Sequence, residues 1–237
     1  TYSQVKNILF LDIETITLFS SYEEMDERGK KLWDKKSLYF EKLNLGIEQT
    51  YRQKGGIFAE FSKIIAISVG FFILDENDKL IFRVKTFSSL DEKEVLSNFK
   101  QLIEDKFNPS SLRLCAHNGK EFDYPYLCKR LLINQIRIPS VLDISGKKPW
   151  EIMHLDTMDM WKFGDFKNQT SLETLAYVFN VASSKNDIDG SQVSNTFYDE
   201  ENGLEKITNY CQNDVIVLAQ IYLSFQCLPQ LTENQII

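Results

Sequence analysis

The chain has 237 residues, of which 43% are hydrophobic, 13% aromatic and 26% charged. This composition is typical of one folded domain and excludes a largely disordered chain. The formal charge of −7 argues against a protein that coats nucleic acid by electrostatic attraction, although it allows an enzyme that meets nucleic acid locally. The longest apolar run, residues 64–74, is too short to span a bilayer, and residues 1–7 do not read as a signal peptide. We therefore expect a cytoplasmic protein with no membrane contact.

The four cysteines lie far apart and form no Cys-x-x-Cys pair. This spacing favours reduced core thiols over a zinc site or a disulfide framework.

The first apolar run, Ile8 to Leu11, ends in two carboxylates, Asp12 and Glu14. The run predicts a central strand that is covered on both faces. If the strand continues, alternation places both carboxylates on one side, about 6–7 Å apart. Two like charges in that position are stable mainly with a proton or a hard divalent cation between them. The alternative is that the strand ends here and both acids are solvated turn residues.

The next segments predict a helical insertion and a hairpin. Residues 16–60 are rich in Lys, Glu and Asp and carry apolar residues at helical spacing, so we expect helices packed over one end of the sheet. The β-branched and aromatic runs 64–74 and 80–87, separated by a polar turn, predict an antiparallel hairpin. A sequence resembling a capping box at residues 89–92 predicts a helix that stops at Asn108-Pro109.

The second half of the chain alternates short strands with helices. The predicted elements are a strand over 112–116, a helix over about 124–132, a strand over 153–156, a helix from a capping box at 170–173 to about Asn180, a polar loop over 182–195, and a long helix from residues 202–205 onward. This order resembles a ribonuclease H-like fold, which is α/β with a five-stranded mixed sheet flanked by helices. We expect one domain over residues 1–237, with the insertion at about 16–60.

Two further acids occupy places where such a sheet could gather them. Asp123 stands directly before a predicted helix with Pro125 near its start, and by itself this pattern favours a helix N-cap. Tyr210 and Asp214 are four residues apart in the last helix and share one face, with Asp214 on or beside the apolar stripe. The alternative for this helix is an exposed acid and a tyrosine that fills the core.

Taken in order, the three acidic segments resemble the motifs of the DEDD superfamily of 3'-to-5' exonucleases, also called DnaQ-like. The motifs are Asp12-x-Glu14, Asn118-x-x-x-Phe122-Asp123 and Tyr210-x-x-x-Asp214. The tyrosine form of the third motif is that of the DEDDy branch, which includes the proofreading domains of family B DNA polymerases. The DEDDh branch would place a histidine at the position of Asn209. The resemblance runs from about Ile8 to Phe225 and is nearest to stand-alone bacterial exonucleases.

The resemblance implies hydrolysis of the terminal phosphodiester with two divalent cations, Mg²⁺ or Mn²⁺. It implies that four acids hold the ions: Asp12, Glu14, Asp123 and Asp214. It also implies that Tyr210 orients the attacking water. Thr15 and Asn118 are the expected substrate contacts, whereas Phe122 is expected to pack.

Several alternatives stay open at this point. A single-stranded 3' end of DNA is the favoured substrate, but no motif distinguishes DNA from RNA, so an RNA-trimming enzyme is also consistent with the sequence. A catalytically idle nucleic-acid-binding or scaffold module is the third hypothesis, and the intact set of acids argues against it. We expect structural roles for His117 and His154, while Asp156 is either an acid near the site or a helix cap. The sequence reveals no polymerase domain and identifies no polymerase or repair partner.

Overall fold

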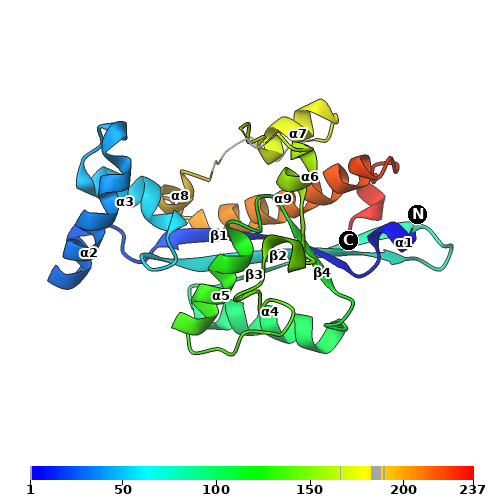
Figure 1. Cartoon of the computed structure of the whole chain (residues 1–237), viewed down its shortest axis with the longest axis horizontal. Helices are drawn as coiled ribbons and strands as arrows, with labels where there is room; N and C mark the ends of the chain where they lie inside the picture. Colours follow the sequence, from blue (N-terminus) through cyan, green and yellow to red (C-terminus); the bar gives the residue numbers. More distant parts are fainter. Residues whose placement is uncertain (1, 166, 183–187, 189) are drawn as a thin grey trace.

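A mixed five-stranded sheet forms the centre of the computed structural model, which describes residues 2–165, 167–182, 188 and 190–237 (Figure 1). The strands are β1 (Ile8–Thr17), β2 (Ser62–Leu74), β3 (Leu80–Ser88), β4 (Arg113–Ala116) and β5 (Leu155–Asp156), in the spatial order β3-β2-β1-β4-β5. The pairs β1–β2 and β2–β3 are antiparallel, whereas β1–β4 and β4–β5 are parallel. The predicted mixed sheet and its hairpin are therefore confirmed.

Helices cover both faces of this sheet (Figure 1). The α-helices are α1 (Tyr2–Val5), α2 (Glu27–Ser37), α3 (Ile47–Lys54), α4 (Glu92–Lys106), α5 (Asp123–Ile133), α6 (Thr157–Lys162), α7 (Leu172–Val178), α8 (Val193–Asp199) and α9 (Gly203–Phe225). Short 3₁₀ turns are η1 (Tyr22–Glu24), η2 (Leu38–Leu43), η3 (Gly55–Ile57), η4 (Pro149–Glu151) and η5 (Glu233–Gln235). Helices α4 and α5 pack on one face and α9 on the other. Among the described helices, none is long and apolar enough to cross a bilayer.

Alternation along β1 decides which way its side chains point. Three odd-numbered residues join the core under α4 and α5: Leu9, Leu11 and Ile13. Three even-numbered residues pack in the cores that include α9: Ile8, Phe10 and Ile16. Asp12 and Glu14 lie in this even-numbered row, so two carboxylates interrupt an apolar stripe that faces α9. The strand runs on to Thr17, and the alternative of a strand that ends before these acids is wrong.

The helical insertion after β1 lies beyond one end of the sheet, at the left of Figure 1. It has a small core of its own, in which Trp33 is fully buried and its ring lies 5.2 Å from that of Tyr51 and 5.1 Å from that of Phe61. Arg52 attaches the insertion to α8, because its guanidinium donates to Asn195 at 3.1 Å and pairs with Asp199 at 2.6 Å. The insertion is therefore held in a fixed place beside β1.

A buried ion pair joins the elements on the other face. Arg130 of α5 donates to both carboxylate oxygens of Glu92 of α4, at 2.7 and 2.5 Å, and both residues are under 8% exposed. Glu92 also accepts from the Ile64 amide of β2 at 2.7 Å, and Arg130 donates to the Ala59 carbonyl at 2.7 Å. This network fixes α5, whose first residue is Asp123, against the sheet.

Some boundaries differ from the predictions. Strand β5 has only two residues, since His154 turns inward to accept from the Leu114 amide. Helix α7 is capped by Ser171 and not by Thr170. The predicted polar loop 182–195 runs into α8 at Val193, while residues 183–187 and 189 lie outside the described part of the chain. Helix α8 was missed because its stability comes from tertiary contacts, such as the bond from the Thr17 amide to Ser194 Oγ at 3.1 Å.

Candidate active site

The first motif lies at an irregularity in the sheet. Glu14 is opposite Ala66 on β2 and Thr15 is opposite Ile64, so Ile65 is an extra residue at this point. Such bulges occur often beside active sites because they redirect side chains. Glu14 is 7% exposed and Asp12 is half-buried. Both side chains line a cleft of about 300 Å³ between β1, the insertion and α9.

The two carboxylates of β1 are buried close to other negative charges, and one of their oxygens lacks a partner in the described part of the chain. Asp12 Oδ2 is inaccessible and has no hydrogen-bond partner among the described residues. Burial, followed by the charges of Glu14, Asp214 and Asp123, raises the pKa of Asp12 well above its usual value. Burial and the charges of Asp214 and Asp123 raise the pKa of Glu14 in the same way. This arrangement fits a hard divalent cation, which would satisfy the unpaired oxygen and offset the repulsion.

Helix α9 carries the third motif across the cleft from β1. Tyr210 and Asp214, one turn apart, both line the cleft, so neither is the exposed acid or the pure core residue of the alternative interpretation. Burial is the main cause that raises the pKa of the Tyr210 hydroxyl, and the charge of Asp214 is the next. The hydroxyl therefore keeps its proton at neutral pH. It can orient a water molecule, but it does not act there as a base.

Cys211 is a neighbour of the carboxylates that the sequence did not single out. Its Sγ, one ligand oxygen of Asp12 and one of Glu14 lie within 4.8 Å of one another, and its thiol donates to the Asp12 carbonyl at 3.5 Å. Burial raises the pKa of this thiol well above its usual value, so it remains protonated. A protonated thiol is a poor ligand for a hard cation. All four cysteines are unpaired, as predicted, but Cys227 is exposed because it lies in the turn after α9 and not in the core.

Asp123 enters the cluster from α5. Phe122 occupies the N-cap position and Asp123 is the first residue of the helix, so the alternative of a simple capping acid is wrong. The Asp123 side chain is 3% exposed, and burial raises its pKa to about 7 even though hydrogen bonds from its own amide and that of Ile13 act in the opposite direction. Its charge also acts on Asp12 and Glu14. It therefore belongs to the same electrostatic cluster.

Asp156 holds the turn that leads to Asp123. Its carboxylate accepts from the amides of Asn118 at 2.9 Å and Lys120 at 3.0 Å. It also caps α6 by accepting from the Met158 amide at 3.0 Å. Asn118 has a φ of +64°, a conformation that asparagine tolerates better than most residues. Asp156 is thus both a helix cap and a support for the second motif.

Both histidines bridge elements of the fold. The ring nitrogens of His117 bond to Thr157 Oγ1 and the Thr170 carbonyl, each at 2.9 Å. His154 links the Leu114 amide to the Val141 carbonyl, at 3.2 and 2.8 Å. Burial lowers the pKa of each ring. These contacts are those of structural residues.

The two expected substrate contacts differ in position. Thr15 lines the cleft, and its hydroxyl donates to the Gly56 carbonyl at 2.7 Å. Asn118 is not among the residues that line the cleft, and its role in substrate binding remains a prediction. Phe122 packs on Tyr126 with ring centroids 5.1 Å apart, as expected, but it also forms part of the cleft wall.

Several cleft residues were not found by sequence reasoning. Most come from the insertion and from α8: Arg52, Gln53, Gly56, Ile57 and Ser194. No motif marks these residues, since each is an ordinary side chain until the insertion folds back beside β1. Their common feature is proximity to the carboxylates in space.

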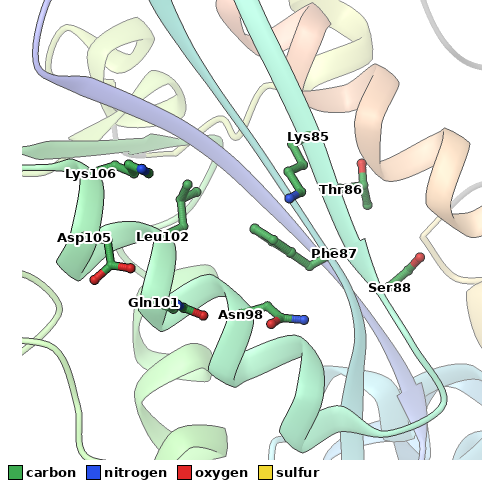
Figure 2. Close-up of a pocket in the computed structure, with 9 residues that line it drawn as sticks. All are labelled: Lys85, Thr86, Phe87, Ser88, Asn98, Gln101, Leu102, Asp105 and Lys106. Carbon is green, nitrogen blue, oxygen red and sulfur yellow. The ribbon is translucent and has the colours of Figure 1, made fainter.

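Figure 2 shows a larger hollow, of about 570 Å³, between β3 and α4. It is lined by Lys85, Thr86, Phe87, Ser88, Asn98, Gln101, Leu102, Asp105 and Lys106. None of the clustered acids reaches it, and the carboxylate among its residues, Asp105, is exposed. The smaller cleft beside Asp12 is therefore the better candidate for catalysis.

Comparison with known families identifies the family of this chain. Residues 57–236 match the family described as "Predicted 3'-5' exonuclease related to the exonuclease domain of PolB". The chain belongs to this family. The match begins after Asp12 and Glu14, so it includes the second and third motifs but not the first. The first motif is related to the other two by its position in the fold. No curated protein matches the chain.

The fold of this exonuclease family member is similar to that of a solved polymerase. The family B DNA polymerase from the hyperthermophilic archaeon Pyrobaculum calidifontis matches with a TM-score of 0.56 and 14% identity. The match covers 92% of this chain and 24% of the polymerase, so the chain spans about a quarter of that protein's length. The likeness supports the α/β ribonuclease H-like class.

Proposed function

We propose that the protein is a metal-dependent exonuclease of the DEDDy type that removes nucleotides from the 3' end of single-stranded DNA. One observation supports this proposal above the others. Asp12, Glu14 and Asp214 line one cleft, the charge of Asp123 acts on the first two, and Asp12 Oδ2 has no hydrogen-bond partner among the described residues. A scaffold module would gain nothing from four acids that repel one another, whereas a phosphodiesterase needs them to hold cations.

The four clustered acids are the proposed cation ligands. Their oxygens suit Mg²⁺ or Mn²⁺, which prefer carboxylates over thiols. When bound, a pair of such ions supplies charge stabilisation for both the attacking and the leaving oxygen of an in-line displacement.

The remaining cleft residues would bind the strand end and position the water. Tyr210 keeps its proton and offers a hydroxyl beside Asp214, suited to orienting the attacking water. Phe122 and Ile57 give the cleft apolar walls against which the terminal base can pack. Thr15 lies beside Glu14, where it can contact the terminal nucleotide. Hydrolysis adds the water oxygen to phosphorus and breaks its bond to the 3' oxygen, which leaves with a proton, so the products are a nucleoside 5'-monophosphate and a shortened strand.

Degradation of labelled oligonucleotides tests the proposal. DNA and RNA strands labelled at the 5' end should shorten one nucleotide at a time with Mn²⁺ and stay intact with EDTA, and DNA should be degraded faster. A circular single strand should survive, because it has no end. Asp12→Ala should abolish hydrolysis, whereas Asp105→Asn, which removes an exposed carboxylate on α4, should retain it.

Three outcomes would contradict parts of the proposal. Binding of the strand without hydrolysis under any divalent cation would favour an idle module. Faster loss of RNA than of DNA would make the enzyme an exoribonuclease. Cleavage of the circle at the rate of the linear strand would make it an endonuclease.

A further inference from the structure

The active-site cleft continues into a second hollow on the helical insertion. This second hollow, here called the insertion groove, has a volume of about 450 Å³. It is lined by Tyr39, Phe40, Lys42, Leu43, Gln53, Lys54, Ile57, Gly190 and Ser191. Four of these residues also line the active-site cleft: Gln53, Ile57, Gly190 and Ser191. A nucleic-acid strand whose end lies at the carboxylates, and which leaves the cleft on this side, would therefore pass directly onto the insertion.

An exposed aromatic ring stands on this path. Tyr39, in η2, is 81% exposed, and Ile57 is 48% exposed. The backbone that carries Tyr39 is anchored, because the neighbouring Phe40 ring packs 5.9 Å from that of Phe58, at the edge of the small core around Trp33. An exposed ring on an anchored backbone, with the Lys36 ammonium 5.5 Å from its centroid, is a suitable platform for stacking an unpaired base.

The part of the insertion that carries the groove is locally basic, although residues 16–60 as a whole contain eight Lys and Arg and eight Asp and Glu. Residues 27–54 contain eight Lys and Arg against four Asp and Glu, whereas the chain as a whole has a net charge of −7. Within the described part of the chain, neither Lys42 nor Lys54 forms an ion pair. Both lysines line the insertion groove, so their ammonium groups are available to phosphates.

We infer that the insertion groove binds the nucleotides that precede the 3' end of a single strand. A base stacks on Tyr39, and the adjoining phosphates lie near Lys42 and Lys54. The inference rests on the proposed exonuclease function, because it is the strand end in the active-site cleft that directs the rest of the strand here. An acidic protein is the alternative occupant, and it could also bind the two lysines. Such a partner would not require a groove that is continuous with the active-site cleft. This role would explain an insertion that carries no catalytic motif.

Substitution of the ring and of the two lysines tests the inference. Binding of 5'-fluorescent DNA and RNA strands of 2 to 12 nucleotides is measured by anisotropy without a divalent cation, and KM is measured with Mn²⁺. Wild-type affinity should rise with length, and Tyr39→Ala should reduce the gain from 2 to 12 nucleotides at least about 5-fold, the lower limit expected for one stacked base. The double variant Lys42→Ala/Lys54→Ala should lower the slope of log Kd against log salt by about 1.4, the value for two phosphates on a single strand.

Matched controls lie elsewhere on the surface. Tyr177→Ala removes a tyrosine of α7 that is also 81% exposed, and Lys93→Ala/Lys129→Ala removes two exposed lysines from α4 and α5. Strand binding should be the same in both controls as in the wild type. If Tyr39→Ala loses no more affinity than Tyr177→Ala at any length, the inference is wrong.

A small substrate separates this failure from that of the proposed function. The p-nitrophenyl ester of thymidine 5'-monophosphate is too short to reach the insertion groove. If the wild type with Mn²⁺ hydrolyses neither this ester nor an oligonucleotide, the proposed function fails, while the anisotropy data still decide whether the groove binds strands. If the wild type hydrolyses both and Tyr39→Ala behaves as the control does, only the groove assignment fails.

Discussion

Removing the charge of Asp123 should stabilise the metal-free protein. Burial raises the pKa of this carboxyl from 3.8 to about 7. The native state therefore holds a proton that the unfolded chain has already released between about pH 4 and 7, and the free energy of unfolding falls as pH rises through this window. At about 1.4 kcal/mol per pH unit, the full penalty above pH 7 is roughly 4 kcal/mol. Asp123→Asn cannot ionise and avoids this penalty.

Urea denaturation in EDTA measures the effect. At pH 8 the Asp123→Asn variant should be more stable than the wild type by up to roughly 4 kcal/mol, or on the order of 10 °C in Tm for a chain of this size. At pH 5 the gain should be under about 2 kcal/mol, because this pH is only about one unit above the pKa of the unfolded carboxyl, so most of the penalty has not yet accumulated. Asp105→Asn, which removes an equal charge from an exposed position, should show little difference at either pH.

Cation binding should reverse the order of stability. Saturating Mn²⁺ at pH 8 should stabilise the wild type more than Asp123→Asn, because the amide is a poorer ligand for a hard cation than the carboxylate. Two results would refute the reasoning. One is a variant no more stable than the wild type at pH 8 in EDTA, and the other is a gain that is the same at pH 5 and pH 8.

Three further predictions concern other parts of the structure. Tyr210→Phe should slow single-turnover hydrolysis with little change in Mn²⁺ affinity or stability, whereas Asp214→Asn should slow hydrolysis and also weaken Mn²⁺ binding. Normal turnover in Tyr210→Phe would show that this ring only packs. Arg130→Met should cost about 3–5 kcal/mol in urea denaturation because it leaves Glu92 buried without its cation, and a loss below about 1 kcal/mol would contradict this. Asp156→Asn should cost about 1–3 kcal/mol, since an amide nitrogen then faces a backbone amide, and should lower kcat; unchanged kcat would separate Asp156 from the site.

The supporting residues show where sequence reasoning stops. Asp156 was open between two roles, and the structure gives it both, because its four accepted bonds come from two separate segments, residues 118–120 and 158–159. For Asp123 the local pattern favoured a cap, and only the family resemblance placed it among the cation ligands; its buried carboxyl adds its charge to those of Asp12 and Glu14. Local pattern describes the neighbours along the chain, whereas the pKa of a buried acid depends on neighbours in space.

The sequence by itself determined which side chains share one face of a strand or helix, because this depends only on the period of that element. Alternation along β1 puts Asp12 and Glu14 on one face, and the i, i+4 spacing puts Tyr210 and Asp214 on one face of α9. The tertiary structure alone decided that these two faces meet. It also decided that the insertion supplies a wall of the cleft and that α8, which has little helical pattern of its own, forms against it. These outcomes depend on packing and ion pairs between segments as far apart as Arg52 and Asp199, and no short window of sequence contains that information.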